Sequence, residues 1–355
     1  MANRFRRSIG RALLAATLCV LSLSSFAKDD YRIAWSIYVG WMPWDYAERS
    51  GIVDKWAEKY GITIEVVQFN DYIESINQYT VGAFDGCTMT NMDALTIPAA
   101  GGVDSTALIV GDFSNGNDGI VLKGAGKSVA DLRGQNVNLV ELSVSHYLLA
   151  RALASVDMTE RDLTVVNTSD ADIVAAFATD DVTSVVTWNP LLAEVQAMPD
   201  VSPVFDSSSI PGEIIDMLVV NTEALEDPRL GKALAGAWYE TMAVMSAAGA
   251  DGDAAKTLMA EASGTDLAGY EAQLAATQMF YEPAPAVEFV RSSALSDTMT
   301  NVAGFSYLHG LLGEGAPGPE FIGIELPGGA VLGSETNVKL RFDDTYMQMA
   351  ADGEI

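Results

Sequence analysis

Short apolar runs alternate with longer amphipathic segments along this chain, and the alternation predicts strands followed by helices. Runs rich in β-branched residues predict strands at 31–36, 62–69, 86–90, 105–110, 120–122, 136–140, 163–167, 184–187, 214–220 and 338–342. Apolar residues with a helical period predict helices at 47–60, 72–83, 94–99, 128–132, 147–155, 170–178, 228–247, 254–262 and 267–278. This order is typical of an α/β protein with parallel sheets.

Two irregular stretches divide the chain into two expected lobes. Residues 112–119 are mostly Asn, Gly, Ser and Asp, which predicts a flexible joint, and a second irregular piece covers 205–212. We expect 119–213 to form one lobe. The other lobe is then discontinuous, from 28–118 and 214–355, and includes a C-terminal extension. Two connections between two lobes predict a hinge.

The first residues have the pattern of a signal peptide. Four arginines precede an apolar run at 12–23, and the small residues Ser25 and Ala27 flank Phe26 as at a cleavage site. We therefore expect cleavage after Ala27 and a periplasmic protein. No later stretch is long and apolar enough to predict a membrane span.

Charge and rare residues narrow the function classes. The net charge is −28, and without the leader 16 basic residues remain against 48 acidic ones, a net charge of −32. This balance argues against binding to nucleic acid or anionic membranes. It fits a cationic ligand, although a solvated acidic surface alone also explains it. Beyond the leader only Cys87, His146 and His309 remain of the Cys and His residues, so we expect no disulfide, metal or cofactor.

The strongest candidate site follows the first predicted strand. Tyr38, Trp41, Trp44 and Asp45 are crowded into the turn between that strand and the next helix. Ligands of open α/β sheets bind outside the carboxyl ends of strands, where such turns lie. Aromatic faces there indicate a boxed small ligand, and the alternative is a hydrophobic plug between helix and sheet.

Other predicted strand ends contribute polar and aromatic side chains to the same edge. The candidates are Asn91, Asp93, Glu141, Ser143, Ser145, His146, Trp188, Asn189 and Asp216. Every charged candidate except His146 is acidic, whereas a buried anion is best held by Arg or Lys. A cation or a neutral molecule with several donors fits better. A planar cation over Trp or Tyr gains about 0.5–2 kcal/mol per face, and guanidinium also matches a carboxylate bidentately.

Several candidates also have structural explanations. Asp45 and Asp93 are placed to cap helix N-termini, and the same holds for Ser143 and Ser145. His146 can be a hydrogen-bonded structural residue, and Trp188 can cover the end of the sheet. Glu141 directly follows an apolar strand, where a charge is costly without a purpose, and this position favours a ligand role.

Several segments resemble the periplasmic substrate-binding proteins of ABC importers of the nitrate/sulfonate/taurine type. They are Gly40-Trp41-Met42-Pro43-Trp44, Asn91-Met92-Asp93-Ala94-Leu95, Asp131-Leu132-Arg133-Gly134-Gln135 and Ser145-His146-Tyr147-Leu148-Leu149. The tail resembles the branch found beside urea carboxylase genes. Its matching segments are His309-Gly310-Leu311-Leu312-Gly313-Glu314-Gly315-Ala316, Phe321-Ile322-Gly323-Ile324-Glu325 and Lys339-Leu340-Arg341-Phe342-Asp343-Asp344.

The resemblance implies a two-lobed periplasmic binding protein fold of type II, with a double-crossover hinge and mostly parallel sheets flanked by helices. It implies a monomeric, non-catalytic protein that delivers guanidine or urea to an ABC permease in the inner membrane. One alternative keeps this role for an anion such as taurine, an alkanesulfonate or nitrate. Another is an enzyme in which Cys87 and His146 attack an amidine carbon.

Overall fold

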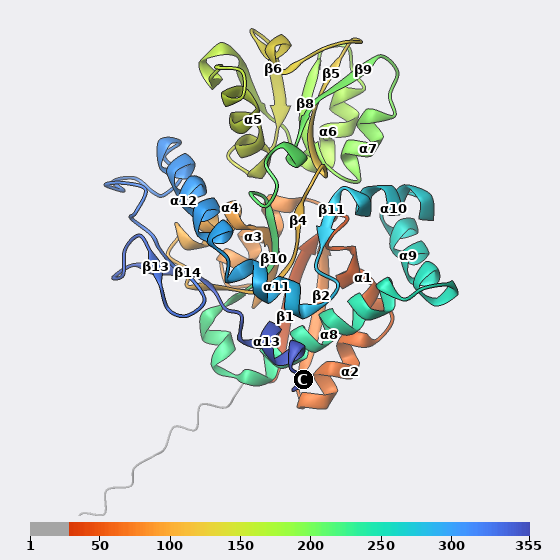
Figure 1. Cartoon of the computed structure of the whole chain (residues 1–355), viewed down its shortest axis with the longest axis vertical. Helices are drawn as coiled ribbons and strands as arrows, with labels where there is room; N and C mark the ends of the chain where they lie inside the picture. The colour runs from red at the N-terminus through yellow and green to blue at the C-terminus, as the bar shows by residue number, and fades with distance from the viewer. Residues whose placement is uncertain (1–27) are drawn as a thin grey trace, which may run out of the picture.

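The computed structural model describes residues 28–355, so the expected leader and its cleavage site lie outside the described residues. The chain forms two β-sheets, each flanked by helices, and Figure 1 shows them one above the other. We call the sheet that contains the first strand, with its helices, the first lobe, and the other the second lobe. None of the helices between residues 28 and 355 is long and apolar enough to cross a membrane.

The first lobe is built on a sheet with the strand order β13-β12-β14-β4-β10-β3-β1-β2, and β11 pairs with β4. Its strands are β1 (Asp30–Ser36), β2 (Thr63–Phe69), β3 (Gly86–Thr90), β4 (Ser105–Ser114), β10 (Ile215–Asn221), β11 (Thr277–Met279), β12 (Gly323–Glu325), β13 (Val331–Leu332) and β14 (Val338–Phe342). The predicted buried strand at 86–90 is confirmed, since all of its residues are buried.

The helices of the first lobe come from both ends of the chain. They are α1 (Met42–Arg49), α2 (Ile52–Tyr60), α3 (Tyr72–Thr80), α4 (Asn91–Ala94), the π-helix η1 (Leu95–Ala99), η5 (Thr222–Glu226), α8 (Pro228–Ser246), α9 (Ala250–Ala262), α10 (Leu267–Ala275), α11 (Pro283–Val290), α12 (Ser293–Leu308) and α13 (Thr345–Ala351). The predicted helix at 47–60 is wrong in its continuity. Gly51 adopts a left-handed conformation with φ of 75°, which ends α1 and starts α2.

The second lobe has the strand order β7-β6-β8-β5-β9. Its strands are β5 (Asp118–Lys123), β6 (Asn136–Leu139), β7 (Thr164–Asn167), β8 (Ser184–Trp188) and β9 (Val201–Asp206). Its helices are η2 (Val129–Leu132), α5 (Val144–Ala154), η3 (Glu160–Asp162), α6 (Asp170–Phe177) and α7 (Leu191–Gln196), and η4 (Ser207–Ser209) leads back to the first lobe. The sequence pattern missed β9. The expected lobe boundaries at 118/119 and 213/214 stay a prediction.

Both sheets are mixed, but most strands of each run in one direction, which confirms the expectation of mostly parallel sheets. β10 runs antiparallel to β3 and to β4, because it brings the chain back from the second lobe. In the second lobe β5 likewise runs antiparallel to β8 and β9. Parallel pairs remain where a helix connects neighbouring strands, as in β1 with β2.

The stretch at 112–119 is ordered and buried, in contrast to the flexible joint predicted from its polar composition. β4 continues through Ser114, and β5 begins at Asp118. Ser207 from the returning connection fixes the crossing, since its hydroxyl lies 2.7 Å from the Ser114 hydroxyl and accepts the Gly116 N–H at 2.7 Å. Hydrogen bonds between the two connections therefore replace the solvent that their polar side chains would otherwise need.

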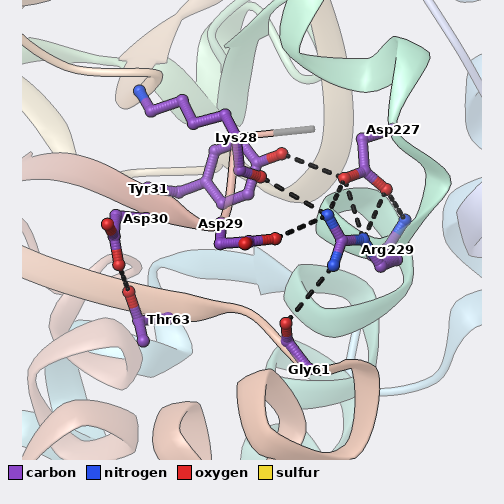
Figure 2. A network of polar contacts seen from close by, with 8 residues as sticks. All are labelled: Lys28, Asp29, Asp30, Tyr31, Gly61, Thr63, Asp227 and Arg229. Atoms are coloured by element: carbon purple, nitrogen blue, oxygen red, sulfur yellow. Dashed lines mark hydrogen bonds and ion pairs between the residues drawn. The ribbon is translucent and has the colours of Figure 1, made fainter. Parts of the chain in front are cut away.

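Arg229 ties the first strand to α8, as Figure 2 shows. Its guanidinium donates to Asp227 at 2.6 Å and to Asp29 at 3.0 Å, and it also reaches the Gly61 carbonyl at 3.3 Å. The Tyr31 hydroxyl donates to the same Asp227 carboxylate at 3.2 Å. A guanidinium fork can hold two chain segments at once in this way.

A glycine in α8 allows close packing against α2. An added Cβ at Gly236 would lie 2.3 Å from the Trp56 ring, and the Trp56 indole N–H donates to Glu240 at 2.7 Å. Glycine in a helix interior costs about 1 kcal/mol relative to alanine, so close approach of the ring is the physical reason for its presence.

We expect Gly236→Ala to lower the free energy of unfolding by about 1–3 kcal/mol, because overpacking outweighs the gain in helix propensity. The matched control is Gly304→Ala in α12, where an added Cβ meets no atom within 4 Å. That variant should be as stable as the wild type or more stable. Calorimetry on the three proteins tests this, and equal stabilisation by both substitutions would contradict the packing argument.

Candidate functional site

A small cavity lies between the two lobes, where the space not filled by atoms, including its opening to solvent, is about 250 Å³. The first lobe provides Tyr38, Trp41, Tyr72, Thr90 and Asp216, and the second lobe provides Asp118, Val144 and Trp188. This volume is below the range of about 300–1,000 Å³ that is typical for drug-sized ligands. The cavity therefore suits a molecule of only a few heavy atoms.

Four aromatic rings line the cavity in a chain of contacts. The ring of Trp41 lies 5.0 Å from that of Tyr38 and 5.6 Å from that of Tyr72, centroid to centroid. The Trp188 ring continues the chain, at 5.6 Å from Tyr72 with an interplanar angle of 72°. These edge-to-face and tilted arrangements are favourable for aromatic pairs.

The rings are placed by local chain geometry. Tyr38 and Trp41 lie in the turn between β1 and α1, and Tyr72 is the first residue of α3 after β2. Trp188 ends β8 in the opposite lobe, and its indole N–H donates to the Ile37 carbonyl at 3.3 Å. The box is thus completed only when the second lobe lies against the first.

Two buried carboxyl groups line the cavity, and two more lie directly behind its aromatic lining. Asp118 and Asp216 face the space itself, at 3% and 2% exposure. Asp112 accepts a hydrogen bond from the Tyr38 hydroxyl at 3.0 Å, and Asp93 accepts from the Tyr72 hydroxyl at 2.7 Å. Within the described part of the chain, no Lys, Arg or His lines the cavity.

Burial makes these carboxyl groups weak acids. Desolvation raises the pKa of Asp112 and that of Asp118 to about 7, and that of Asp93 to about 6. Desolvation and the nearby Asp112 raise the pKa of Asp216 well above its ordinary value. Asp112 and Asp216 are cross-strand neighbours on β4 and β10, and two buried like charges at such a distance disfavour ionisation of both.

Several oxygens of this group have no hydrogen-bond partner among residues 28–355. They are Oδ1 of Asp93, Oδ2 of Asp112 and Oδ2 of Asp216. Buried carboxylate oxygens without partners are costly unless a proton or another cation compensates them. Of these three residues Asp216 lines the cavity, and its carboxylate together with the aromatic walls has the chemistry to bind a small cation that carries N–H donors.

The structure brings together four of the side chains expected from the sequence. Tyr38, Trp41, Trp188 and Asp216 line the cavity, and Asp93 supports Tyr72 from behind. Asp93 does not cap α4, because Thr90 holds that position. Side chains at the ends of several strands thus meet in one cavity between the lobes.

Other expected residues from the first lobe have structural contacts outside the cavity lining. Trp44 packs against Trp238 with ring centroids 5.2 Å apart, as a core residue. Asp45 lies inside the first turn of α1 and pairs with Arg49 one turn later. The Asn91 side chain accepts the Ile215 N–H at 3.0 Å and so fixes the start of β10.

The expected residues at the start of α5 and α7 also make local contacts. Ser143 caps α5 by accepting the Ser145 N–H at 3.2 Å, and the Ser145 hydroxyl is buried. Asn189 accepts the Ala193 N–H at 3.0 Å through its side chain. Its backbone carbonyl accepts the Val39 N–H at 3.3 Å, which links the lobes beside the cavity.

Glu141 and His146 lie away from the cavity lining. Glu141 is exposed, so water solvates its carboxylate and its charge is not buried. Its backbone N–H donates to the Asn167 side chain at 3.0 Å. His146 accepts the Leu142 N–H at 3.1 Å on Nδ1 and faces Glu160 with Nε2. The position of Glu141 directly after an apolar strand therefore does not place its side chain in the cavity lining.

The sequence argument missed Tyr72, Asp118 and Val144 as lining residues, whereas the end of the third strand does indicate Thr90. Tyr72 starts the helix after the second strand, so the strand-end rule applied to the first strand predicts it equally well. Asp118 was hidden in the stretch interpreted as a flexible joint. Val144 carries no distinctive signal, since a valine at an element boundary is common.

The proposed Cys87–His146 pair has no support in the hydrogen bonding. Cys87 is fully buried in β3, and its thiol lies 3.6 Å from the Ser75 hydroxyl. Desolvation raises the pKa of this thiol to about 12, which suppresses the thiolate that a nucleophile requires. His146 instead contacts the Leu142 N–H and the Glu160 carboxylate.

The lobes are closed around the cavity. The Ser169 hydroxyl on the second lobe donates to Asp71 on the first at 2.7 Å, and the Tyr72 N–H donates to Asp170 at 3.3 Å. With the contacts of Trp188 and Asn189, these bonds line the inter-lobe seam. A ligand in the cavity would be enclosed by both lobes.

The architecture agrees with a known sequence family. The sequence pattern of the family described as NMT1/THI5 like matches residues 56–282, which is more than half of the chain. The chain belongs to the NMT1/THI5-like family. It is also similar to a Brucella abortus (strain 2308) protein whose name assigns it provisionally to binding proteins, with 26% identity over 190 residues. That match covers 52% of this chain and 57% of the Brucella protein.

Two solved structures have a fold similar to that of this chain. It is similar to the alkanesulfonate-binding protein SsuA from Xanthomonas axonopodis pv. citri bound to MOPS, at 18% identity and a TM-score of 0.64, covering 81% of this chain and 95% of that one. It is similar to the periplasmic nitrate-binding protein NrtA from Synechocystis PCC 6803, at 12% identity and a TM-score of 0.55, covering 92% and 98%. The predicted α/β fold of periplasmic binding proteins is confirmed.

The raised carboxyl pKa values predict that the unliganded protein loses stability as pH rises from about 4 to above 7. These groups bind protons more tightly when folded, so their stabilisation is present below the unfolded pKa and lost through the folded one. Each contributes a slope of up to about 1.4 kcal/mol per pH unit. Asp216→Asn should flatten this slope, whereas Asp180→Asn, an exposed change of equal charge, should not. Calorimetry from pH 4 to 8 tests this, and parallel profiles for both variants would contradict it.

Proposed function

We propose that this protein is an extracytoplasmic solute-binding protein that captures a small planar cation, guanidinium, between its two lobes. One observation carries the proposal. The inter-lobe cavity combines four aromatic rings with two buried carboxyl groups and, among its lining residues, no basic side chain. Guanidinium is weakly hydrated, can lie over an aromatic face, and donates N–H bonds to carboxylates in its own plane.

Charge complementarity favours a cation over an anion. An anion in this cavity would face Asp118 and Asp216 and would require both to stay protonated. A cation instead compensates them and lowers their pKa values, so we expect binding to release protons near neutral pH. The names of the structural neighbours point to sulfonates and nitrate, and ligand class is a property of the site rather than of the fold.

Urea is the second candidate within the same shape class. It has the outline of guanidinium without the charge, and it is compatible with carboxyl groups that keep their protons. Neutral urea gains less from a buried carboxylate than a cation does, because charge-assisted hydrogen bonds are about twice as strong. The unpartnered oxygens near the cavity therefore favour guanidinium. The resemblance of the tail to proteins encoded beside urea carboxylase genes implies either ligand.

We assign the lining residues distinct roles. Trp41, Tyr72 and Trp188 provide the ring faces, and Asp118 and Asp216 accept the N–H groups of the ligand. Because Asp118 and Trp188 belong to the second lobe and the others to the first, the ligand bridges both lobes. Binding would then shift the population toward the closed form, which docks on an ABC permease in the inner membrane.

Ligand selectivity tests the proposal. Titration calorimetry with guanidinium, urea, methylguanidine, taurine and nitrate should give the tightest binding for guanidinium. Guanidinium is used at low millimolar concentration or below, with sodium chloride of equal ionic strength as the control. Tight binding of taurine or nitrate with none of guanidinium would overturn the cation assignment.

Two substitutions locate the site. Asp216→Asn should weaken guanidinium binding by about a hundredfold or more, because a buried cation loses its charged partner. Trp188→Ala should weaken it by about 2- to 30-fold, the range of one cation–π contact. Asp180→Asn should bind like the wild type, since Asp180 is exposed and outside the cavity lining. Unchanged binding by folded Asp216→Asn protein would place the ligand elsewhere.

A further inference from the structure

A second polar cluster joins the two lobes apart from the cavity. It consists of His146 on α5 and Glu160 on η3, both in the second lobe, and His309 at the end of α12 in the first lobe. Glu160 is shared between the histidines, at 2.7 Å from His309 Nε2 and 3.2 Å from His146 Nε2. Figure 1 shows α12 beside the lower end of α5.

The hydrogen bonds of His309 define its protonation state in this closed form. Nδ1 lies 2.9 Å from the Phe305 carbonyl, which can only accept, so Nδ1 carries a proton. Nε2 lies 2.7 Å from a Glu160 oxygen, and a carboxylate oxygen also only accepts. Both ring nitrogens therefore donate, and His309 is an imidazolium paired with a carboxylate.

His146 has the opposite arrangement. Its Nδ1 accepts the Leu142 N–H at 3.1 Å, so in the neutral ring the proton sits on Nε2, toward Glu160. A metal ion would need a free lone pair on that nitrogen. The three residue types are those of a zinc site, but the hydrogen bonds favour a proton as the cation between them.

Partial shielding from solvent strengthens the interaction between His309 and Glu160. The His309 ring stacks on Phe305 with centroids 4.0 Å apart, and the side chains of His309 and Glu160 are 20% and 29% exposed. Burial raises the pKa of Glu160, but the hydrogen bonds and charges of His146 and His309 outweigh it and lower that pKa.

The titratable groups that face His309 from neighbouring elements are Glu160 on η3 and His146 on α5. Farther along α5, Arg151 and Tyr147 bond to Glu213, which lies on the connection that returns to the first lobe. The charge of Glu213 is thus already compensated by Arg151. Protonation of His309 changes mainly its bond to Glu160.

The cluster is close to the cavity along the chain. α5 starts at Val144, which lines the cavity, and His146 follows two residues later. The same helix packs its Tyr147 ring against Phe305 of α12, at 5.2 Å between centroids. A displacement of α5 during lobe opening would therefore move both the cavity wall and the partner of His309.

We propose that His309 and Glu160 form a proton-controlled clasp between the lobes, which favours the closed form at acidic pH and weakens as His309 loses its proton. The direction of this pH dependence follows from the hydrogen bond between His309 and Glu160. The Glu160 carboxylate can accept from His309 Nε2 only while that nitrogen carries a proton, so the clasp is present at low pH and lost as pH rises. Imidazole is the side chain whose ordinary charge change falls between about pH 5 and 8.

The clasp acts in opposition to the cavity carboxyl groups. Protonation of Asp118 and Asp216 at low pH removes the attraction for a cation, whereas protonation of His309 favours closure. In unliganded protein the buried carboxyl groups also favour closure at low pH, so the part of the pH dependence that is lost in His309→Gln measures the clasp. The proposal therefore stands or falls independently of the ligand assignment.

The test measures the inter-lobe distance in unliganded protein by spin labelling at Val81→Cys and Asp180→Cys, two exposed positions on opposite lobes, while Cys87 is buried. From pH 8 to pH 5 the ratio of closed to open form should rise about two- to fivefold, the range of a partly exposed ion pair. His309→Gln should reduce this dependence to the part that the buried carboxyl groups cause, while keeping a donor to Glu160. Glu194→Gln, an exposed change on α7, should behave like the wild type.

Glu160→Gln gives a second, sharper result. A glutamine amide can donate to Nε2 of neutral His309, so this variant should lose the closure at low pH or reverse its direction. A wild-type profile in His309→Gln, or no pH dependence in the wild type, would overturn the clasp. Closure that requires Zn²⁺ and is abolished by a chelator would also overturn it and assign the cluster to a metal.

Discussion

Burial of carboxyl groups against aromatic rings, with no basic side chain in the lining, is the constraint on which the rest of this site depends. Ionising Asp118 or Asp216 in the cavity requires a compensating cation, because the surroundings offer none from the protein. Without one, the groups retain protons near neutral pH. The acidic groups of the cavity thus lack a basic counterpart, and the proposed preference for a cationic ligand rests on this lack.

The strand arrangement explains why the acids meet. β10 inserts antiparallel between β3 and β4, and its register pairs Asp216 with Thr90 on one side and with Asp112 on the other. Asp118 begins the strand that carries the chain into the second lobe. The acidic group therefore sits on the connections between the lobes, so that the charge of a ligand and the position of the lobes can influence one another.

Relatives of similar fold are named for sulfonates and nitrate, whereas this cavity has acidic and aromatic walls. The fold supplies a cleft between two lobes, with turns at strand ends where ligands can bind, and the fold alone does not fix which ligand is bound. Gly40, in the turn after the first strand, packs closely against one of the acids. An added Cβ there would lie 2.4 Å from an oxygen of Asp112. A glycine at this turn lets the aromatic residues of the first turn and the acids of the crossing strands approach each other.

The sequence by itself determined the α/β class, the order of most strands and helices, and the aromatic turn that holds Tyr38 and Trp41, because hydrophobic period and turn residues are local properties. It also indicated an acidic site without basic residues. Only the tertiary structure decided which carboxyl groups reach the cavity, since that depends on the register of β10 and on a crossing whose polar residues resemble a loop. Burial, not composition, separates Asp118 and Asp216 from the exposed Glu141, and burial is fixed by contacts between segments far apart in the chain.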